Sequence, residues 1–89
     1  MIEKQVTIIN KLGLHARAAA KFVAIASGYQ SEIHLSKDGQ LVNGKSIMGV
    51  MMLAAGKHSV ITLHARGADA GEAVAALETL INERFNEAE

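Results

Sequence analysis

Three stretches of the chain alternate apolar and polar side chains with a period of two, which is typical of half-buried β-strands. They lie at residues 2–8, 31–37 and 60–65. A short fourth strand, Gln40–Asn43, is predicted after Asp38 and Gly39, a dipeptide that favours a two-residue hairpin turn. The pattern therefore predicts four strands, two of which form an antiparallel hairpin.

Apolar side chains recur at helical spacing in two longer segments. Residues 16–27 are alanine-rich and contain no proline, and residues 70–85 have the same periodicity. The apolar stripes consist of Ala19, Phe22, Val23 and Ala26 in the first segment, and of Val74, Leu77 and Ile81 in the second. Asp69 and Glu72 have the spacing of a capping box for the second helix. The charged residues 86–89 beyond it are expected to fray.

A third, shorter helix of about two turns is predicted after Ser46, which has the side chain of a good N-cap. Gly49 weakens this helix. A helix of this length cannot bury all of its apolar residues on one side. We therefore expect one or two of its methionines in the core and an exposed apolar surface from the others. The methionines are Met48, Met51 and Met52.

The predicted order of elements is βαββαβα. All three helices need an apolar partner, so we expect them to cover one face of a four-stranded sheet and to leave the other face in water. This arrangement is an α+β open-faced two-layer β-sandwich. The length of 89 residues fits a single domain, 1–89.

Composition excludes several classes of protein. Nine basic and nine acidic residues give a net charge of zero, and only three residues are aromatic, which argues against a nucleic-acid binder. No cysteine is present, so there is neither a disulfide framework nor a thiolate metal site. The N-terminus is too charged for a signal peptide, and no apolar run approaches bilayer length. We therefore expect a cytoplasmic protein without a membrane partner.

The strongest chemical signal is a histidine and an arginine, His15 and Arg17, at the predicted start of the first helix. Gly13 frees the backbone to turn just before them. The first amides of a helix have no partner within it, and the helix dipole adds partial positive charge, so this end can bind an anion. Arg17 adds a planar guanidinium suited to phosphate oxygens.

The positive helix end disfavours imidazolium, so His15 is expected to be a neutral nucleophile. Its Nδ1 is the ring nitrogen nearer the backbone, and a phosphoryl group on it could fold back onto the amides of Ala16 and Arg17. We infer a phosphohistidine site on Nδ1. From the H-x-R spacing alone, a simpler interpretation carries more weight, in which His15 is a polar residue at a helix start and Arg17 a solvated charge.

Four histidines raise the question of a metal site. His34 and His64 both fall on the polar side of predicted strands and would lie close together if those strands were neighbours. Two ligands without a carboxylate or thiolate at fixed spacing make a weak site. Solvated sheet residues are the favoured interpretation, and no metal or cofactor is expected.

Two separated motifs resemble the histidine-containing phosphocarrier protein HPr family of the bacterial phosphoenolpyruvate-dependent phosphotransferase system. They are Gly13-Leu14-His15-Ala16-Arg17 followed by Ala19, and Lys45-Ser46. The similarity covers essentially the whole chain. The family usually has proline where this chain has Ala18. Proline is tolerated in a first helical turn and alanine is a good helix former, so the helix should survive this departure.

The resemblance implies a sheet of order 1-4-2-3 and a phosphoryl carrier that catalyses nothing alone. His15 would accept the group from phosphorylated enzyme I with the help of Arg17, and enzyme IIA proteins would receive it. The output would be sugar uptake or regulation, with the nitrogen-branch carrier as the alternative within the class. The rival from another class is a non-phosphorylated α/β binding module in which His15 is only a cap. A monomer is expected.

The resemblance also implies a docking patch for enzyme I and enzyme IIA and a second site of modification. The patch consists of Ile47, Met48 and Met51, with Ala20, Lys21 and Ala24 across the groove. The segment around Ser46 resembles the one that an HPr serine kinase/phosphorylase modifies in many members of the family. Ser46 is therefore expected to be a regulatory phosphorylation site as well as a cap.

Overall fold

The computed structural model describes residues 1–89, and its elements follow the predicted order. They are β1 (Ile2–Thr7), α1 (Ala16–Ala26), β2 (Glu32–Lys37), β3 (Gln40–Asn43), α2 (Ile47–Met52), β4 (Val60–Arg66), α3 (Ala70–Asn82) and the short 3₁₀ turn η1 (Arg84–Asn86). None of these helices has the length and apolarity needed to cross a bilayer.

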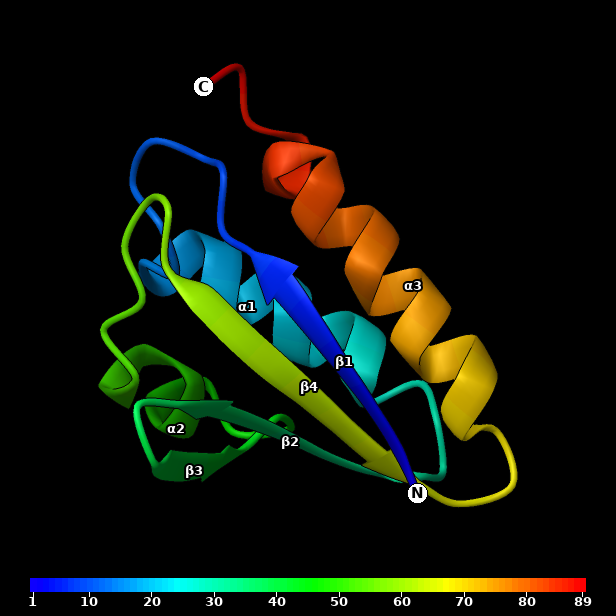
Figure 1. The fold of residues 1–89 in the computed structure, drawn as a ribbon. Coiled ribbons are helices and arrows are strands. Elements are labelled where there is room, and N and C mark those ends of the chain that lie inside the picture. Colours follow the sequence, from blue (N-terminus) through cyan, green and yellow to red (C-terminus); the bar gives the residue numbers. More distant parts are fainter.

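The four strands form one antiparallel sheet in the order β1-β4-β2-β3, and the three helices cover one of its faces (Figure 1). The central strand β4 pairs with β1 through Val6 and Ile61, and with β2 through Leu35 and Leu63. This topology confirms the predicted open-faced sandwich. Asp38 and Gly39 both have positive φ in the β2–β3 turn, which is the backbone geometry that the dipeptide predicts.

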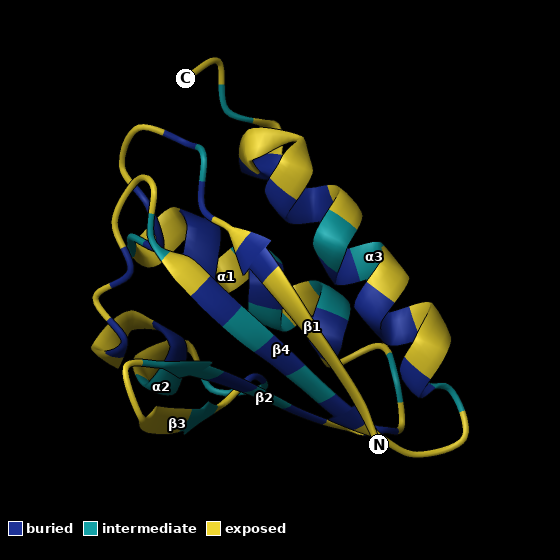
Figure 2. Cartoon of the chain, in the orientation of Figure 1, coloured by how far each residue is buried: buried dark blue, intermediate teal, exposed yellow.

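The core lies between the sheet and the helices. Buried and partly exposed residues alternate along β4, and a buried stripe runs down α3 (Figure 2). The largest fully buried apolar side chains are Phe22, Phe85, Ile8, Ile33, Leu35, Ile61, Leu63, Leu77 and Ile81. The predicted helix stripes are thus confirmed, except that Val23 is only partly buried and Ala18 is buried completely.

The prediction that one or two methionines of α2 lie in the core is wrong. Met48, Met51 and Met52 are 72%, 39% and 63% exposed, and Val50 and Leu53 fill the core positions. In this six-residue helix only Val50 is buried, and Leu53, the C-cap residue, fills the next position toward the core. The expected exposed apolar surface is therefore present, and it is larger than predicted.

The predicted capping box at α3 is also wrong. Asp69 is the N-cap residue, but its carboxylate makes no bond to its own helix. It instead accepts hydrogen bonds from the backbone N–H groups of Gln30 and Ser31, both 2.9 Å long, and from the Ser31 hydroxyl. Asp69 therefore fastens the connection between α1 and β2, because the buried Ser31 needs a partner.

The chain beyond α3 differs from the prediction in two ways. The helix ends at Asn82, and Arg84, Phe85 and Asn86 follow with φ between 55° and 62°, in the left-handed region that non-glycine residues rarely adopt. This turn buries the Phe85 ring completely. The predicted fraying is also wrong, because the chain after this turn runs back to the loop before α1 and makes the bonds described below.

Candidate functional site

A tightly fixed loop leads into α1. Gly13 has φ +66°, and a Cβ on it would lie 2.4 Å from the carbonyl oxygen of Ala55, so only glycine fits. The backbone N–H of Leu14 donates to that same oxygen at 2.9 Å. The buried side chain of Asn10 donates from Nδ2 to the Gly13 carbonyl oxygen at 2.9 Å. These contacts fix the backbone from which His15 projects.

His15 is the N-cap residue of α1, with φ −71° and ψ 177°, as the sequence predicts. Its ring makes no capping bond. The first helical bond runs from the Ala19 N–H to the His15 carbonyl oxygen, so the amides of Ala16, Arg17 and Ala18 make no hydrogen bond within the protein. His15 thus begins the helix without a capping bond from its side chain, and three backbone amides of the first turn are left without a partner.

The ring of His15 is held from the other side by Glu87. The distance from His15 Nε2 to Glu87 Oε2 is 2.6 Å, and Asn10 Nδ2 donates to Glu87 Oε1 at 3.0 Å. The side chain of His15 is 27% exposed and that of Glu87 is 15% exposed. Nε2 is thus occupied, and Nδ1 makes no hydrogen bond within the protein.

Two opposing effects act on the pKa of Glu87. Removal from water works to raise it, but the hydrogen bonds from His15 and Asn10 and the charges of His15 and Lys21 lower it, and the net pKa lies below the ordinary value of 4.5. Glu87 is therefore a carboxylate at neutral pH. It presents a full negative charge to the Nε2 side of the ring.

Arg17 and Lys21 stand beside this pair on α1, and the two cations behave differently. Arg17 is exposed and makes no ion pair or hydrogen bond. The Nζ of Lys21 donates to the Phe85 carbonyl oxygen at 2.6 Å and so anchors the left-handed turn. Both side chains line a surface hollow of about 810 Å³ together with His15 and Glu87. Arg17 is the cation that is free to meet a ligand there.

The remaining predicted residues lie on α1 and α2, which pack against each other. Ser46 caps α2 as predicted, because its Oγ accepts the Gly49 N–H at 3.1 Å. Ile47, Met48 and Met51 are exposed on α2, and Ala20 and Ala24 are exposed on α1. Lys21 is only half-exposed, since its ammonium group is bound to the turn after α3.

Three further residues at the site are not among those predicted from the sequence. Glu87 lies in a segment that looks like a charged tail, Asn10 looks like an ordinary loop residue, and Leu12, 64% exposed, lines the hollow. The one local signal is Asn10 three residues before Gly13, a spacing that suits a side-chain to backbone bond across a turn.

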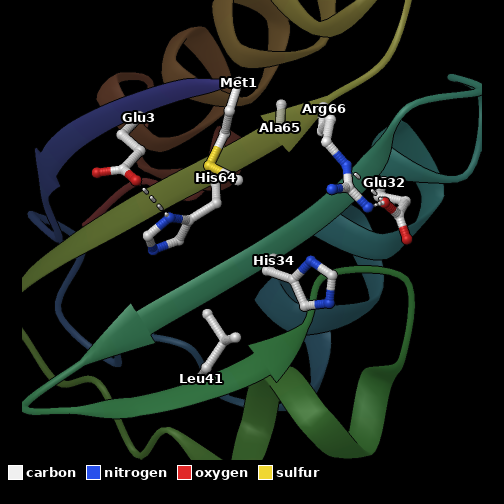
Figure 3. Close-up of a pocket in the computed structure, with 8 residues that line it drawn as sticks. All are labelled: Met1, Glu3, Glu32, His34, Leu41, His64, Ala65 and Arg66. Atoms are coloured by element: carbon white, nitrogen blue, oxygen red, sulfur yellow. Dashed lines mark hydrogen bonds and ion pairs between the residues drawn. The ribbon is translucent and has the colours of Figure 1, made fainter.

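A second hollow, of about 330 Å³, lies on the open face of the sheet (Figure 3). His34 and His64 are direct partners across β2 and β4, so the strands are neighbours as the histidine argument requires. The ring of His64 lies toward Glu3 at 3.6 Å and bonds to the Ser36 hydroxyl at 2.8 Å, and Arg66 pairs with Glu32. No cluster of three metal-ligating side chains exists anywhere in the protein.

Comparison with known proteins identifies the family. Residues 2–83 match the family model described as "PTS HPr component phosphorylation site". The chain belongs to the HPr family. It is 55% identical over 89 residues to the phosphocarrier protein HPr of Neisseria meningitidis serogroup A, and each chain is covered completely. The HPr family supplies the phosphocarrier proteins of the phosphotransferase system.

Solved HPr structures have the same fold. The crystal structure of HPr-C-His from Thermoanaerobacter tengcongensis matches with a TM-score of 0.96 and 47% identity, with both chains covered completely. Crh of Bacillus subtilis, whose crystal structure is described as a swapped dimer, matches with a TM-score of 0.76 and 43% identity over 94% of this chain and 97% of that one. The resemblance drawn from the two sequence motifs is thereby confirmed, as is the sheet order that it implies.

Proposed function

We propose that this HPr-family chain carries a phosphoryl group on Nδ1 of His15, taking it from phosphorylated enzyme I and passing it to enzyme IIA proteins. The observation that carries the proposal is the orientation of the ring. Nε2 is occupied by Glu87 at 2.6 Å, whereas Nδ1 lies on the side of the ring without a partner, at the start of α1. A nucleophile for phosphoryl transfer needs such a free lone pair.

The helix start supplies what the transferred group needs. The amides of Ala16 and Arg17 have no partner within the protein and can donate to phosphoryl oxygens, and the helix dipole favours their negative charge. The unpaired guanidinium of Arg17 adds a mobile cation that can follow the group between donor and acceptor. Because the group is held by surface contacts only, it can leave again, and the chain acts as a carrier that needs its partners for each reaction.

The partner surface in this proposal lies beside the site, on α1 and α2. Its apolar part consists of Ile47, Met48 and Met51, and its small-residue part of Ala20 and Ala24, with Lys21 at the edge. Flexible methionine side chains suit a surface that must bind several partners in turn.

Ser46 is the proposed regulatory site, modified by an HPr serine kinase/phosphorylase. Its hydroxyl is half-exposed at the start of α2, next to Ile47 and Met48. A phosphate there would meet a helix N-terminus that tolerates negative charge, so the fold would persist. The same charge would lie in the apolar docking patch, where burying it against enzyme I is costly.

Incubation with phosphoenolpyruvate and enzyme I tests the carrier function. We expect the parent chain to gain one acid-labile phosphoryl group, seen by mass spectrometry, with a ³¹P–¹⁵N NMR assignment to Nδ1. His34→Gln, on the open face of the sheet, is the matched control and should gain the same group, whereas His15→Gln should gain none. A parent chain that stays unmodified would favour a binding module, and a group on Nε2 would contradict the assignment to Nδ1.

Three further attributes belong to the same proposal: a monomer, a cytoplasmic location and a single folding unit of residues 1–89. Size-exclusion chromatography with light scattering tests the first, since the HPr relative Crh forms a swapped dimer. A screen of enzyme IIA partners decides between sugar uptake and the nitrogen-branch regulatory role.

A further inference from the structure

The segment after α3 is built to bring a carboxylate to His15. The three left-handed residues of η1 reverse the chain, and the buried Phe85 ring holds this reversal in the core. Lys21 binds the Phe85 carbonyl oxygen at 2.6 Å from the side of α1. Glu87 follows two residues later, and its side chain is the one that reaches Nε2 of His15.

Attachment of the C-terminal segment to the rest of the protein does not by itself explain why the Glu87 carboxylate lies beside His15. The backbone is already attached through the N–H of Lys11, which donates to the main-chain oxygen of Glu89 at 2.6 Å. The carboxylate of Glu87 is nevertheless drawn largely out of water, and its two oxygens have separate partners, His15 and Asn10. Asn10 is itself fully buried and bonded to the Gly13 carbonyl oxygen, so the loop that presents His15 also orients the carboxylate.

We propose that Glu87 is a positioning residue for phosphoryl transfer, holding the proton of His15 on Nε2 and leaving the lone pair on Nδ1. This inference rests on the carrier function proposed above. A carboxylate is one of the groups that commonly fix a histidine in this way, so that the opposite ring nitrogen can act as nucleophile, base or ligand. Asn10 acts one step further out, because it bonds the Glu87 oxygen that does not face the ring.

The transfer step balances without any further group. The Nδ1 lone pair forms the nitrogen–phosphorus bond, while the bond from phosphorus to the donor atom breaks and its electron pair leaves with the donor. The proton on Nε2 stays in place, so the ring becomes positively charged as the phosphoryl group arrives. Glu87, 2.6 Å away, stabilises this charge, and the protonated ring is in turn the better leaving group when the phosphoryl group moves on.

The first test is spectroscopic and needs no partner protein. An imidazole N–H that donates to a carboxylate over 2.6 Å should give a downfield proton resonance, coupled to ¹⁵Nε2, that exchanges slowly with water. We expect this signal in the parent chain and in Glu89→Gln, whose carboxylate pairs only with the exposed Lys11. Glu87→Gln keeps the side-chain shape without the charge and should lose the signal. Its persistence in Glu87→Gln would overturn the proposal.

The second test measures transfer. With enzyme I and enzyme IIA, Glu87→Gln should accept and deliver the phosphoryl group about tenfold more slowly than the parent, the size typical of losing such an orienting partner. Glu89→Gln should match the parent. Equal rates for Glu87→Gln and the parent would overturn the role of Glu87 and leave the carrier function standing. A parent that accepts no group would instead contradict the carrier function itself. An unfolding curve for each variant separates these effects from a loss of fold.

Discussion

The helices α1 and α2 both begin at an N-cap residue with an extended backbone, but the side chains of the two cap residues bond differently. Ser46 closes α2 with its own hydroxyl, which accepts the Gly49 N–H at 3.1 Å. His15 holds the equivalent position at α1 with an extended backbone, yet its ring turns toward Glu87 and the first three amides of the helix stay open. One helix start is completed by its cap residue, and the other is left incomplete.

The difference separates a helix start that its own cap residue stabilises from one whose amides remain available to a ligand. A capping side chain typically contributes about 1 kcal/mol to the stability of a helix. The first turn of α1 forgoes that contribution, and it is held instead by packing of the fully buried Ala18, Ala19 and Phe22. Amides that are unsatisfied in the free protein are available to a ligand, so an incomplete helix start in a well-packed helix is a place to look for function.

The largest expected effect is on the open helix start. Arg17→Ala should slow phosphoryl transfer from enzyme I about 100-fold, because it removes the one free cation at the site. The free energy of unfolding should change by less than about 0.5 kcal/mol, since the side chain is exposed and unpaired. Stopped-flow or quench-flow transfer assays and urea unfolding measure the two quantities. Lys57→Ala, another exposed cation, should leave both unchanged, and equal transfer by Arg17→Ala would remove Arg17 from the mechanism.

The carboxylate at the start of α3 makes the stability of the protein sensitive to acid. Hydrogen bonds from the Ser31 hydroxyl and the Gln30 N–H hold the pKa of Asp69 below its ordinary value of 3.8. The stability that Asp69 contributes is therefore complete above pH 3.8 and is lost as pH falls through the lower pKa of the folded state. Unfolding measured at a series of pH values should show this acid limb. It should become shallower in Asp69→Asn and persist in the exposed control Asp38→Asn; an unchanged limb in Asp69→Asn would show that other carboxylates cause it.

Substitutions at Ser46 test the closed helix start and its proposed switch together. Ser46→Ala should cost about 0.5–2 kcal/mol of unfolding free energy as a lost cap, while His15 still accepts the phosphoryl group. Ser46→Asp should keep the cap but react slowly with enzyme I, because its charge would lie in the proposed docking patch. If the aspartate variant is phosphorylated as fast as the parent, Ser46 is a cap and nothing more.

The smallest expected effect comes from restoring proline in the first turn of α1. The amide of Ala18 makes no hydrogen bond, so Ala18→Pro should be tolerated and should stabilise the protein by about 0.4–1 kcal/mol through the unfolded chain. Ala19→Pro is the matched control. It removes the bond from the Ala19 N–H to the His15 carbonyl oxygen and should destabilise the helix by about 3 kcal/mol. A lower melting temperature for Ala18→Pro would show that the fully buried site has no room for the ring.

Most of the fold follows from local patterns. The strand and helix periods, the turn at Asp38 and the cap at Ser46 all depend on residues within a few positions of one another, and the structure has each of them. The predicted capping box at Asp69 was wrong because the backbone N–H and the hydroxyl of Ser31 bind the same carboxylate. Ser31 lies far from Asp69 in the sequence, and no periodicity of the chain indicates that contact.

The candidate site likewise has a part that local sequence predicts and a part that it does not. His15, Arg17 and the open amides are neighbours in sequence, and their grouping could be predicted from a turn followed by a helix. Glu87 reaches His15 across 72 residues, through a left-handed turn of three non-glycine residues that no local propensity favours. The prediction that methionines of α2 lie in the core was wrong for a different reason. The pattern marks these residues as apolar but does not indicate which positions of so short a helix face inward.

The close approach of Gly13 to Ala55 makes glycine a requirement for this loop. Any side chain at that position would collide with a backbone oxygen that cannot move aside, and it would also require a backbone conformation that glycine alone adopts easily. A chain that has the histidine and arginine but lacks this glycine cannot close the loop in the same way. In genome searches, the glycine two residues before the histidine is thus a sharper filter for this type of site than the histidine–arginine spacing itself.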